Sequence, residues 1–205
     1  MPRAGLSRDA VVEHALEVLD AEGAEGLTLT AVARRAGVAV PSLYKHVDGL
    51  PALRRLLMVR IYDDTTARVG AAVMGRSGED ALVAFLGAYR AAVRDHPYRM
   101  ALLEREPDDT PEAERAATAL VGVAFAVVRG FGLQGEDEIH AVRVLRAAVN
   151  GFASLETGTG YRLPTAIDDS FAFLTRLLVT GLREAAAARP ASDAEPAHMD
   201  QQAHT

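Results

Sequence analysis

The sequence predicts an all-α protein with a small three-helix domain at its N-terminus and a larger helical bundle behind it. Apolar residues recur every three or four positions in most segments of the 205-residue chain, which is the period of an α-helix. Two short helical segments near the N-terminus are separated by a turn of about three residues. No segment shows the apolar–polar alternation of a β-strand. Sandwich, barrel and parallel-sheet architectures are therefore not expected.

The first two predicted helices have recognisable ends. Ser7 can cap the first helix, which ends at Gly23. Its apolar positions fall on one face: Val11, Val12, Ala15, Leu16 and Leu19. Thr28 can cap a second, short helix, and Gly37 supplies the positive φ that ends it.

A third helix is predicted from Val40 to Val47. Pro41 is accepted in its first turn, where a missing N–H breaks no hydrogen bond. Leu43 and Val47 are four residues apart and are expected to pack inward together. Only residues 37–39 separate this helix from the second one. Two helices joined in this way form a helix-turn-helix.

The rest of the chain is expected to be helical as far as residue 188. Apolar periodicity and turn residues place five long helices and one short segment, at about 53–74, 79–95, 98–104, 111–129, 136–156 and 168–188. We divide the chain into an N-terminal domain at 1–50 and a C-terminal domain at 51–188. Residues 189–205 have little to bury and are expected to form a disordered tail.

Charge is unevenly distributed along the chain. The formal net charge of −6 does not by itself suggest a nucleic-acid-binding protein. Residues 34–60, however, hold six basic side chains and one acidic one. The six are Arg34, Arg35, Lys45, Arg54, Arg55 and Arg60. A basic N-terminal segment on an acidic body is expected when only one end of a protein contacts a polyanion.

Several other function classes have little support in the sequence. The chain has no cysteine and no tryptophan, which excludes thiolate chemistry and disfavours stacking on single strands. Its histidines and adjacent carboxylate pairs lack metal-ligand spacing, so neither a metal nor a cofactor is expected. No signal-peptide pattern and no membrane-length apolar run is present, so we expect a cytoplasmic protein with no membrane partner.

The outward face of the third helix suits the major groove of double-stranded DNA. A helix of eight residues is about 12 Å long, close to the width of that groove. The side chains that face outward are Pro41, Ser42, Tyr44, Lys45 and His46. Tyr44 and His46 can reach phosphates, and Lys45 can contact a phosphate or the acceptor edge of guanine.

Two sets of residues match the pattern of a known protein family. The first runs from Ser7 to Leu57 and centres on Leu43-Tyr44-Lys45-His46-Val47. It resembles the helix-turn-helix of the TetR family of transcriptional regulators. The second set, within residues 145–171, resembles the WHG C-terminal regulatory domain of part of that family, which usually has His where this chain has Asn150.

The resemblance implies a ligand-responsive DNA-binding transcriptional regulator. Such a protein is more often a repressor, binds a palindromic operator as a homodimer, and is released by a small-molecule effector. The implied DNA-contact residues are Thr28, Thr30, Val40, Pro41, Ser42, Tyr44, Lys45 and His46. The family often has a basic residue at Thr30 or Ala31 and commonly a Lys at Leu50, so two phosphate contacts are missing here.

The C-terminal helices supply candidate dimer and ligand residues. Two apolar stripes can form an intersubunit four-helix bundle or belong to the core of one chain, and the resemblance favours the dimer. They comprise Val142, Leu145, Val149, Phe171, Leu174, Leu178 and Leu182. An effector cavity can be lined by Tyr89, His96, Tyr98, Met100, Phe125 and Phe152, for which ordinary core packing is the alternative.

A competing interpretation belongs to a different functional class. In it the chain is an all-helical enzyme or a protein-interaction module, and the N-terminal helices are only structural. No arrangement of Ser, His and an acid stands out, and no phosphate-binding loop follows a strand. We therefore do not expect an enzyme.

Overall fold

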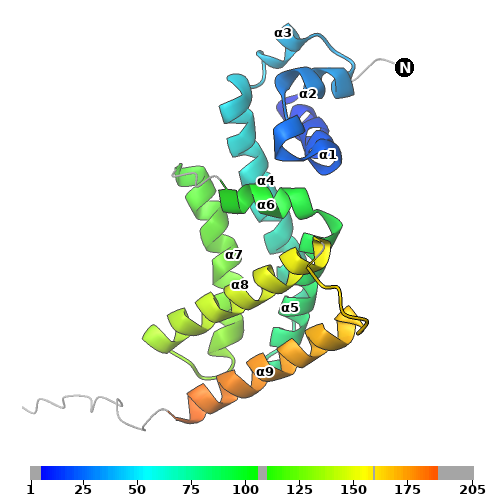
Figure 1. Cartoon of the computed structure of the whole chain (residues 1–205). Helices are drawn as coiled ribbons and strands as arrows, with labels where there is room; N and C mark the ends of the chain where they lie inside the picture. The colour runs from blue at the N-terminus through cyan, green and yellow to red at the C-terminus, as the bar shows by residue number, and fades with distance from the viewer. Residues whose placement is uncertain (1–5, 106–109, 159, 189–205) are drawn as a thin grey trace, which may run out of the picture.

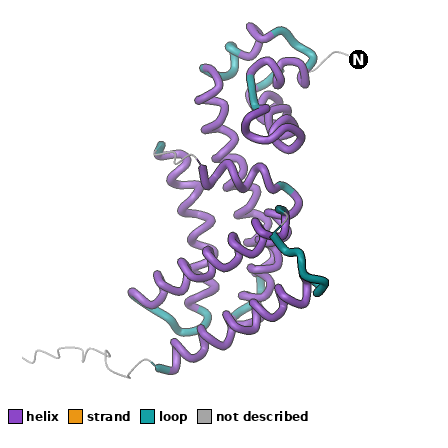
Figure 2. The backbone as a smooth tube through the Cα atoms, in the orientation of Figure 1, coloured by secondary structure: helices purple, strands orange, loops and turns teal. Residues whose placement is uncertain are grey.

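A computed structural model describes residues 6–105, 110–158 and 160–188 (Figure 1). Within these residues the chain forms nine helices joined by turns and loops, with no strand, which confirms the all-α class (Figure 2). They are α1 (Arg8–Gly26), α2 (Leu29–Ala36), α3 (Val40–Leu43), α4 (Gly49–Val73), α5 (Gly78–Asp95), α6 (Pro97–Arg105), α7 (Pro111–Arg129), α8 (Glu136–Thr157) and α9 (Ile167–Ala187). A search of the described helices for a membrane span finds no candidate. The expected tail at 189–205 lies outside the described residues.

Side chains and backbone fix the start of α1 and both ends of α2 as the sequence predicts, whereas α1 continues past the predicted end at Gly23 to Gly26. The Ser7 hydroxyl accepts a hydrogen bond from the Ala10 backbone N–H at 3.1 Å, and Thr28 Oγ1 accepts one from the Ala31 N–H at 3.1 Å. Gly37 ends α2 in the left-handed conformation, with φ of 68°. These contacts satisfy backbone groups that a helix end leaves unpaired.

The third helix is shorter than predicted. Only Val40–Leu43 is α-helical, and residues 44–46 form a turn. The Val47 backbone N–H still donates to the Leu43 carbonyl at 3.0 Å. Ala39 precedes the helix without a side-chain cap, and a missing cap costs roughly 1 kcal/mol. The position of α3 therefore depends on its packing against the other helices.

Helix α1 changes direction at Gly23. This residue has φ of 70° and ψ of −176°, a combination that is essentially restricted to glycine. The ring of Tyr98, from α6, lies close to Gly23. A Cβ atom placed on Gly23 would be only 3.4 Å from that ring. Helix α1 thus bends where α6 reaches it.

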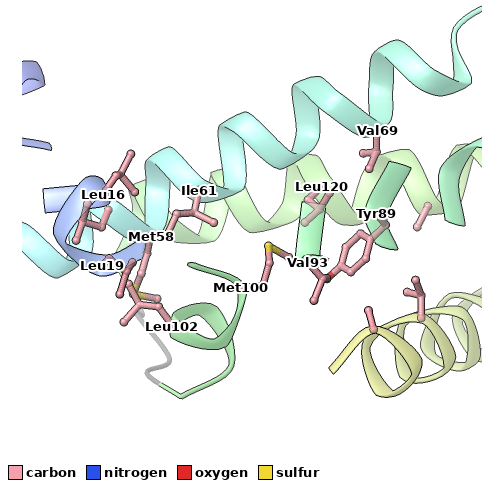
Figure 3. Close-up of a cluster of buried hydrophobic side chains, with 14 of the residues drawn as sticks. Leu16, Leu19, Met58, Ile61, Val69, Tyr89, Val93, Met100, Leu102 and Leu120 are labelled. Atoms are coloured by element: carbon pink, nitrogen blue, oxygen red, sulfur yellow. The ribbon is translucent and has the colours of Figure 1, made fainter. Parts of the chain in front are cut away.

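The N-terminal helices and the body share one hydrophobic core. The 25-residue helix α4 runs from the α1–α3 region into the body, where it packs against α5 and α7 (Figure 1). Leu16 and Leu19 of α1 gather with Met58 of α4 and Leu102 of α6 (Figure 3). A displacement of α4 or α6 therefore acts directly on α1.

A buried guanidinium joins three helices of the body. Arg90 of α5 donates hydrogen bonds of 2.6 and 2.7 Å to Glu156 of α8, and it lies 2.8 Å from Asp168 of α9. The rings of Phe152 and Phe171 flank it, with centroids 5.5 and 4.5 Å from its Cζ. The hydrogen bond with Glu156 holds the pKa of Arg90 above its ordinary value. The pair and its rings fix α5, α8 and α9 relative to one another.

Candidate functional site

The outward face of α3 and of the turn after it presents most of the predicted contact residues. Leu43 is fully buried and Val47 nearly so, and these two side chains set the orientation of the segment. Tyr44 is 57% exposed. Pro41 and Lys45 are also exposed, and Ser42 and His46 are half-buried. This division into inward and outward positions is the one that the sequence predicts, while contact with DNA stays a prediction.

The other three predicted contact residues lie beside this face. Val40 is half-buried in the first position of α3, and Thr28 and Thr30 are exposed at the start of α2. The Thr28 hydroxyl oxygen caps α2, which leaves its proton available to a phosphate oxygen. The structure thus brings all eight residues into α2, α3 and their flanking turns.

Arg8 is an additional residue at this site. Its Nε donates a hydrogen bond to the His46 carbonyl at 3.2 Å. The bond ties the start of α1 to the end of the turn after α3, and the Arg8 side chain remains exposed. The two residues are 38 positions apart, and no local pattern in the sequence reports such a contact.

The basic segment at 34–60 is less available to a polyanion than its composition suggests. Three of its arginines pair with carboxylates of α1. The N–O distances are 3.0 Å for Arg34–Glu22, 2.6 Å for Arg35–Glu17 and 2.7 Å for Arg60–Glu13. Among the described side chains, no carboxylate pairs with Lys45 or Arg55. Exposed ion pairs can exchange partners, but fewer cations are held ready for phosphates than the sequence count implies.

The body contains a mostly apolar cavity of about 80 Å³. It lies among α4, α5, α6, α7 and α8, and Tyr89, Met100 and Leu120 are part of its wall (Figure 3). Tyr89 and Met100 are two of the six predicted ligand residues. The structure therefore places one part of the predicted set around a real cavity.

The other four predicted ligand residues do not line this cavity. The Nδ1 atom of His96 lies 3.1 Å from Asp20 of α1. Tyr98 lines an adjoining open groove of about 310 Å³ beside α6 and α8, which shares Met100 and Asn150 with the cavity. Phe152 packs on Arg90, and Phe125 is half-buried on α7. Aromatic character alone did not distinguish a cavity wall from an interhelical contact.

The cavity wall also includes three polar side chains that the sequence interpretation missed. Tyr62 reaches it from α4, and Arg146 and Asn150 reach it from α8. Arg146 and Asn150 are four positions apart, so they lie on one helix face. Val142, Arg146 and Asn150 are spaced by four residues, which places them on one face of α8. This spacing could have shown that the polar residues lie beside the apolar stripe.

Sequence comparison identifies the family. Residues 11–46 match the model for bacterial regulatory proteins of the tetR family, and residues 82–178 match that for the tetracyclin repressor-like C-terminal domain. An uncharacterised HTH-type transcriptional regulator of Mycobacterium tuberculosis, Rv0681, is 36% identical over 87% of this chain and 83% of its own length. The chain belongs to the TetR family. This family member is a DNA-binding transcriptional regulator and not an enzyme.

Solved structures share the fold of this TetR-family chain. A protein of unknown function from Rhodococcus sp. RHA1 has a TM-score of 0.78 and 23% identity, over 89% of this chain and 99% of that one. BioQ of Mycobacterium smegmatis, in a complex with its double-stranded DNA operator, has a TM-score of 0.64 and 22% identity, with 87% and 98% covered. ActR of Streptomyces coelicolor, in a complex with (S)-DNPA, has a TM-score of 0.64 and 19% identity, with 89% and 100% covered.

Most of the residues expected at a dimer interface of this TetR-family chain lie in the core of the single chain, which is the alternative that the sequence left open, and their part in a dimer stays a prediction. Val142, Leu145 and Val149 are buried and line the cavity, and Leu182 is buried as well. The remaining three, Phe171, Leu174 and Leu178, are half-buried. Helical periodicity identified an apolar face of each helix but could not tell which partner covers it. A second set of apolar side chains, Val144, Leu155, Phe173 and Leu177, is at least half exposed and is called the α8–α9 face below.

Proposed function

We propose that this TetR-family regulator is a cytoplasmic repressor that binds a palindromic operator as a homodimer and is released by a small-molecule effector. The observation that carries the proposal is the outward face of α3, where Tyr44 and Lys45 are exposed while Leu43 and Val47 are buried beneath them. One helix-turn-helix of this size contacts few base pairs. Two copies related by a two-fold axis, reading half-sites about one helical turn apart, supply the missing affinity.

The α8–α9 face is the surface that we assign to the homodimer. Helices α8 and α9 pack against each other and leave large apolar side chains exposed, among them the four of this face. Exposed apolar residues that gather on one surface commonly mark a protein interface. Two copies of this helix pair can form a four-helix bundle. Arg90 pairs with Glu156 of α8 and with Asp168 of α9 and thereby ties the two helices of this face together.

Replacing Leu177 by Glu is expected to convert the dimer into monomers. In a dimer built on this face, each new carboxylate would be buried in an apolar contact, so the dimer dissociation constant should rise at least about a hundredfold. Sedimentation velocity at matched protein concentrations measures this change. Val83→Glu on α5 is the control, because Val83 is an exposed apolar residue outside the α8–α9 face. If the Leu177→Glu variant dimerises like the wild type, the homodimer uses another surface.

Helix α6 supports release by an effector because it contacts both the cavity and α1. Met100 and Leu103 line the cavity. On another side of the same helix, Arg99 Nε donates to Asp20 of α1 at 2.9 and 3.0 Å. A ligand that shifts α6 must therefore strain or break the contact with α1. A preference of about 1–3 kcal/mol for the shifted geometry is a typical coupling between two sites.

Salt dependence of DNA binding tests the proposed function. A duplex is first selected from a random pool by the full-length protein, and its affinity is then measured by fluorescence anisotropy over a range of salt concentrations. Because few cations face outward, we expect a log–log slope no steeper than about −6 for a dimer. A slope near −10 would contradict the small number of phosphate contacts. Failure to enrich any duplex would contradict operator binding itself.

A further inference from the structure

The cavity in the body has one polar side. Its wall is apolar along α5, α6 and α7, and Tyr62, Arg146 and Asn150 line it from α4 and α8. Arg146 and Asn150 lie one turn apart on the same helix face. The Arg146 charge acts on the Tyr62 hydroxyl across the gap between the two helices. The three groups line the same cavity and are called the polar cluster below.

The charge of this cluster is unbalanced. No aspartate or glutamate lines the cavity, and among the side chains that the structure describes none pairs with Arg146. Burial raises the pKa of Tyr62, which keeps its hydroxyl a neutral donor. Arg146 and Asn150 can both donate hydrogen bonds as well. Arg146 is exposed on α8, so its guanidinium reaches solvent as well as the cavity. Without a paired acid, and beside two neutral donors and an apolar wall, it is complementary to the anionic head group of an apolar molecule.

We propose that the cavity binds a molecule with an apolar body and a single carboxylate, with the carboxylate held by Arg146. Asn150 and Tyr62 donate to the carboxylate oxygens, and the apolar body lies against α5, α6 and α7. This assignment of ligand chemistry rests on the proposed role of the cavity as the effector site.

The size of the cavity implies that this ligand moves α6. An engineered cavity of about 150 Å³ is known to hold benzene, whereas this cavity measures about 80 Å³. An apolar body larger than a few carbon atoms must therefore displace part of the wall, and the adjoining groove lies beyond Met100 and Asn150. Met100 of α6 is the most adaptable side chain there, because a thioether chain is unbranched and flexible. A ligand that displaces Met100 thus acts on α6, the helix whose Arg99 contacts Asp20.

Octanoate, octanamide and octylamine test the proposal, because they share one apolar tail and differ in head-group charge. Isothermal titration calorimetry with the full-length protein measures their affinities. We expect octanoate to bind at least about tenfold more tightly than octanamide, and octylamine to bind most weakly. Arg146→Gln should remove the advantage of octanoate. Asn150→Asp should reduce octanoate binding and leave octanamide binding little changed, because it adds a negative charge with almost no change in shape.

Arg94→Gln is the matched control, because Arg94 is an exposed arginine of α5 that does not line the cavity. It should leave the preference for octanoate intact, and circular dichroism checks that all three variants fold. Equal binding of octanoate and octanamide, equal behaviour of Arg146→Gln and Arg94→Gln, or no binding of octanoate at millimolar concentration would each overturn the assignment. DNA binding is measured separately. If the wild-type protein binds the operator but shows no preference for octanoate, only the ligand assignment is refuted. If it prefers octanoate but binds no operator, only the proposed DNA regulation is refuted.

Discussion

Replacing Tyr44 and Lys45 together by Ala is expected to abolish specific DNA binding. Both side chains are exposed and lie on the outward face that Leu43 and Val47 orient. Each substitution removes a contact worth about 1–3 kcal/mol where the wild-type side chain meets a base or a phosphate in the complex. The dimer loses each contact twice, so the affinity for a selected duplex should fall by at least about a thousandfold. Fluorescence anisotropy with that duplex measures the loss.

The same double substitution should leave the fold and the dimer unchanged. Surface substitutions that remove no buried contact usually change stability by about 0.5 kcal/mol or less. A control variant, Met74→Ala with Arg76→Ala, removes an exposed apolar side chain and an exposed arginine at the far end of α4. It should bind the duplex like the wild type. If the Tyr44 and Lys45 variant also binds like the wild type, α3 does not contact the DNA.

Replacing Glu156 by Ala is expected to destabilise the body more than any surface substitution. The Arg90 and Glu156 side chains are each only 10% exposed, and they share two short hydrogen bonds. Removing the carboxylate leaves a buried guanidinium whose one remaining acidic partner among the described residues is the exposed Asp168. Breaking a buried ion pair in this way costs about 3–5 kcal/mol. Urea unfolding at a fixed protein concentration measures the loss, since the stability of a dimer depends on concentration.

Two further variants distinguish the effect of breaking the Arg90–Glu156 ion pair from the general effect of a substitution on stability. Arg183→Ala removes an ion pair with Glu79 in which both side chains are exposed, and such pairs contribute about 0–1 kcal/mol. Arg90→Met combined with Glu156→Leu removes both charges and should recover part of the stability lost in Glu156→Ala. If Glu156→Ala costs no more than Arg183→Ala, the Arg90 contacts do not hold α5, α8 and α9 together.

Local signals account for the parts of the fold that could be predicted. Ser7 and Thr28 cap helices because a short hydroxyl side chain reaches an N–H group three residues ahead. Gly37 ends α2 because only glycine adopts its backbone conformation at low cost. The inward packing of Leu43 and Val47 follows from their spacing of four residues. Each of these effects acts within one or two turns of helix, so one segment of sequence contains all the information.

Contacts between distant segments account for the parts that could not be predicted. The Arg35–Glu17 ion pair joins residues 18 positions apart, and composition counts the arginine without its partner. Similarly, His96 and Tyr98 are ligand candidates by residue type, but His96 lies beside Asp20 of α1, and Tyr98 lies against Gly23 and lines the outer groove. Helix α8 carries apolar side chains on two faces, and periodicity alone could not assign one face to the cavity and the other to a second copy.

Acylation of Lys45 tests most directly whether the outward face of α3 contacts DNA. Lys45 is the only lysine in the sequence, so mass spectrometry assigns lysine acylation to a single position. With a saturating amount of the selected duplex, its acylation rate with an N-hydroxysuccinimide ester should fall at least about tenfold, because a groove or phosphate contact buries the amine. A duplex of scrambled sequence at the same concentration should protect it less. An unchanged rate while the selected duplex is fully bound would contradict the proposed recognition face.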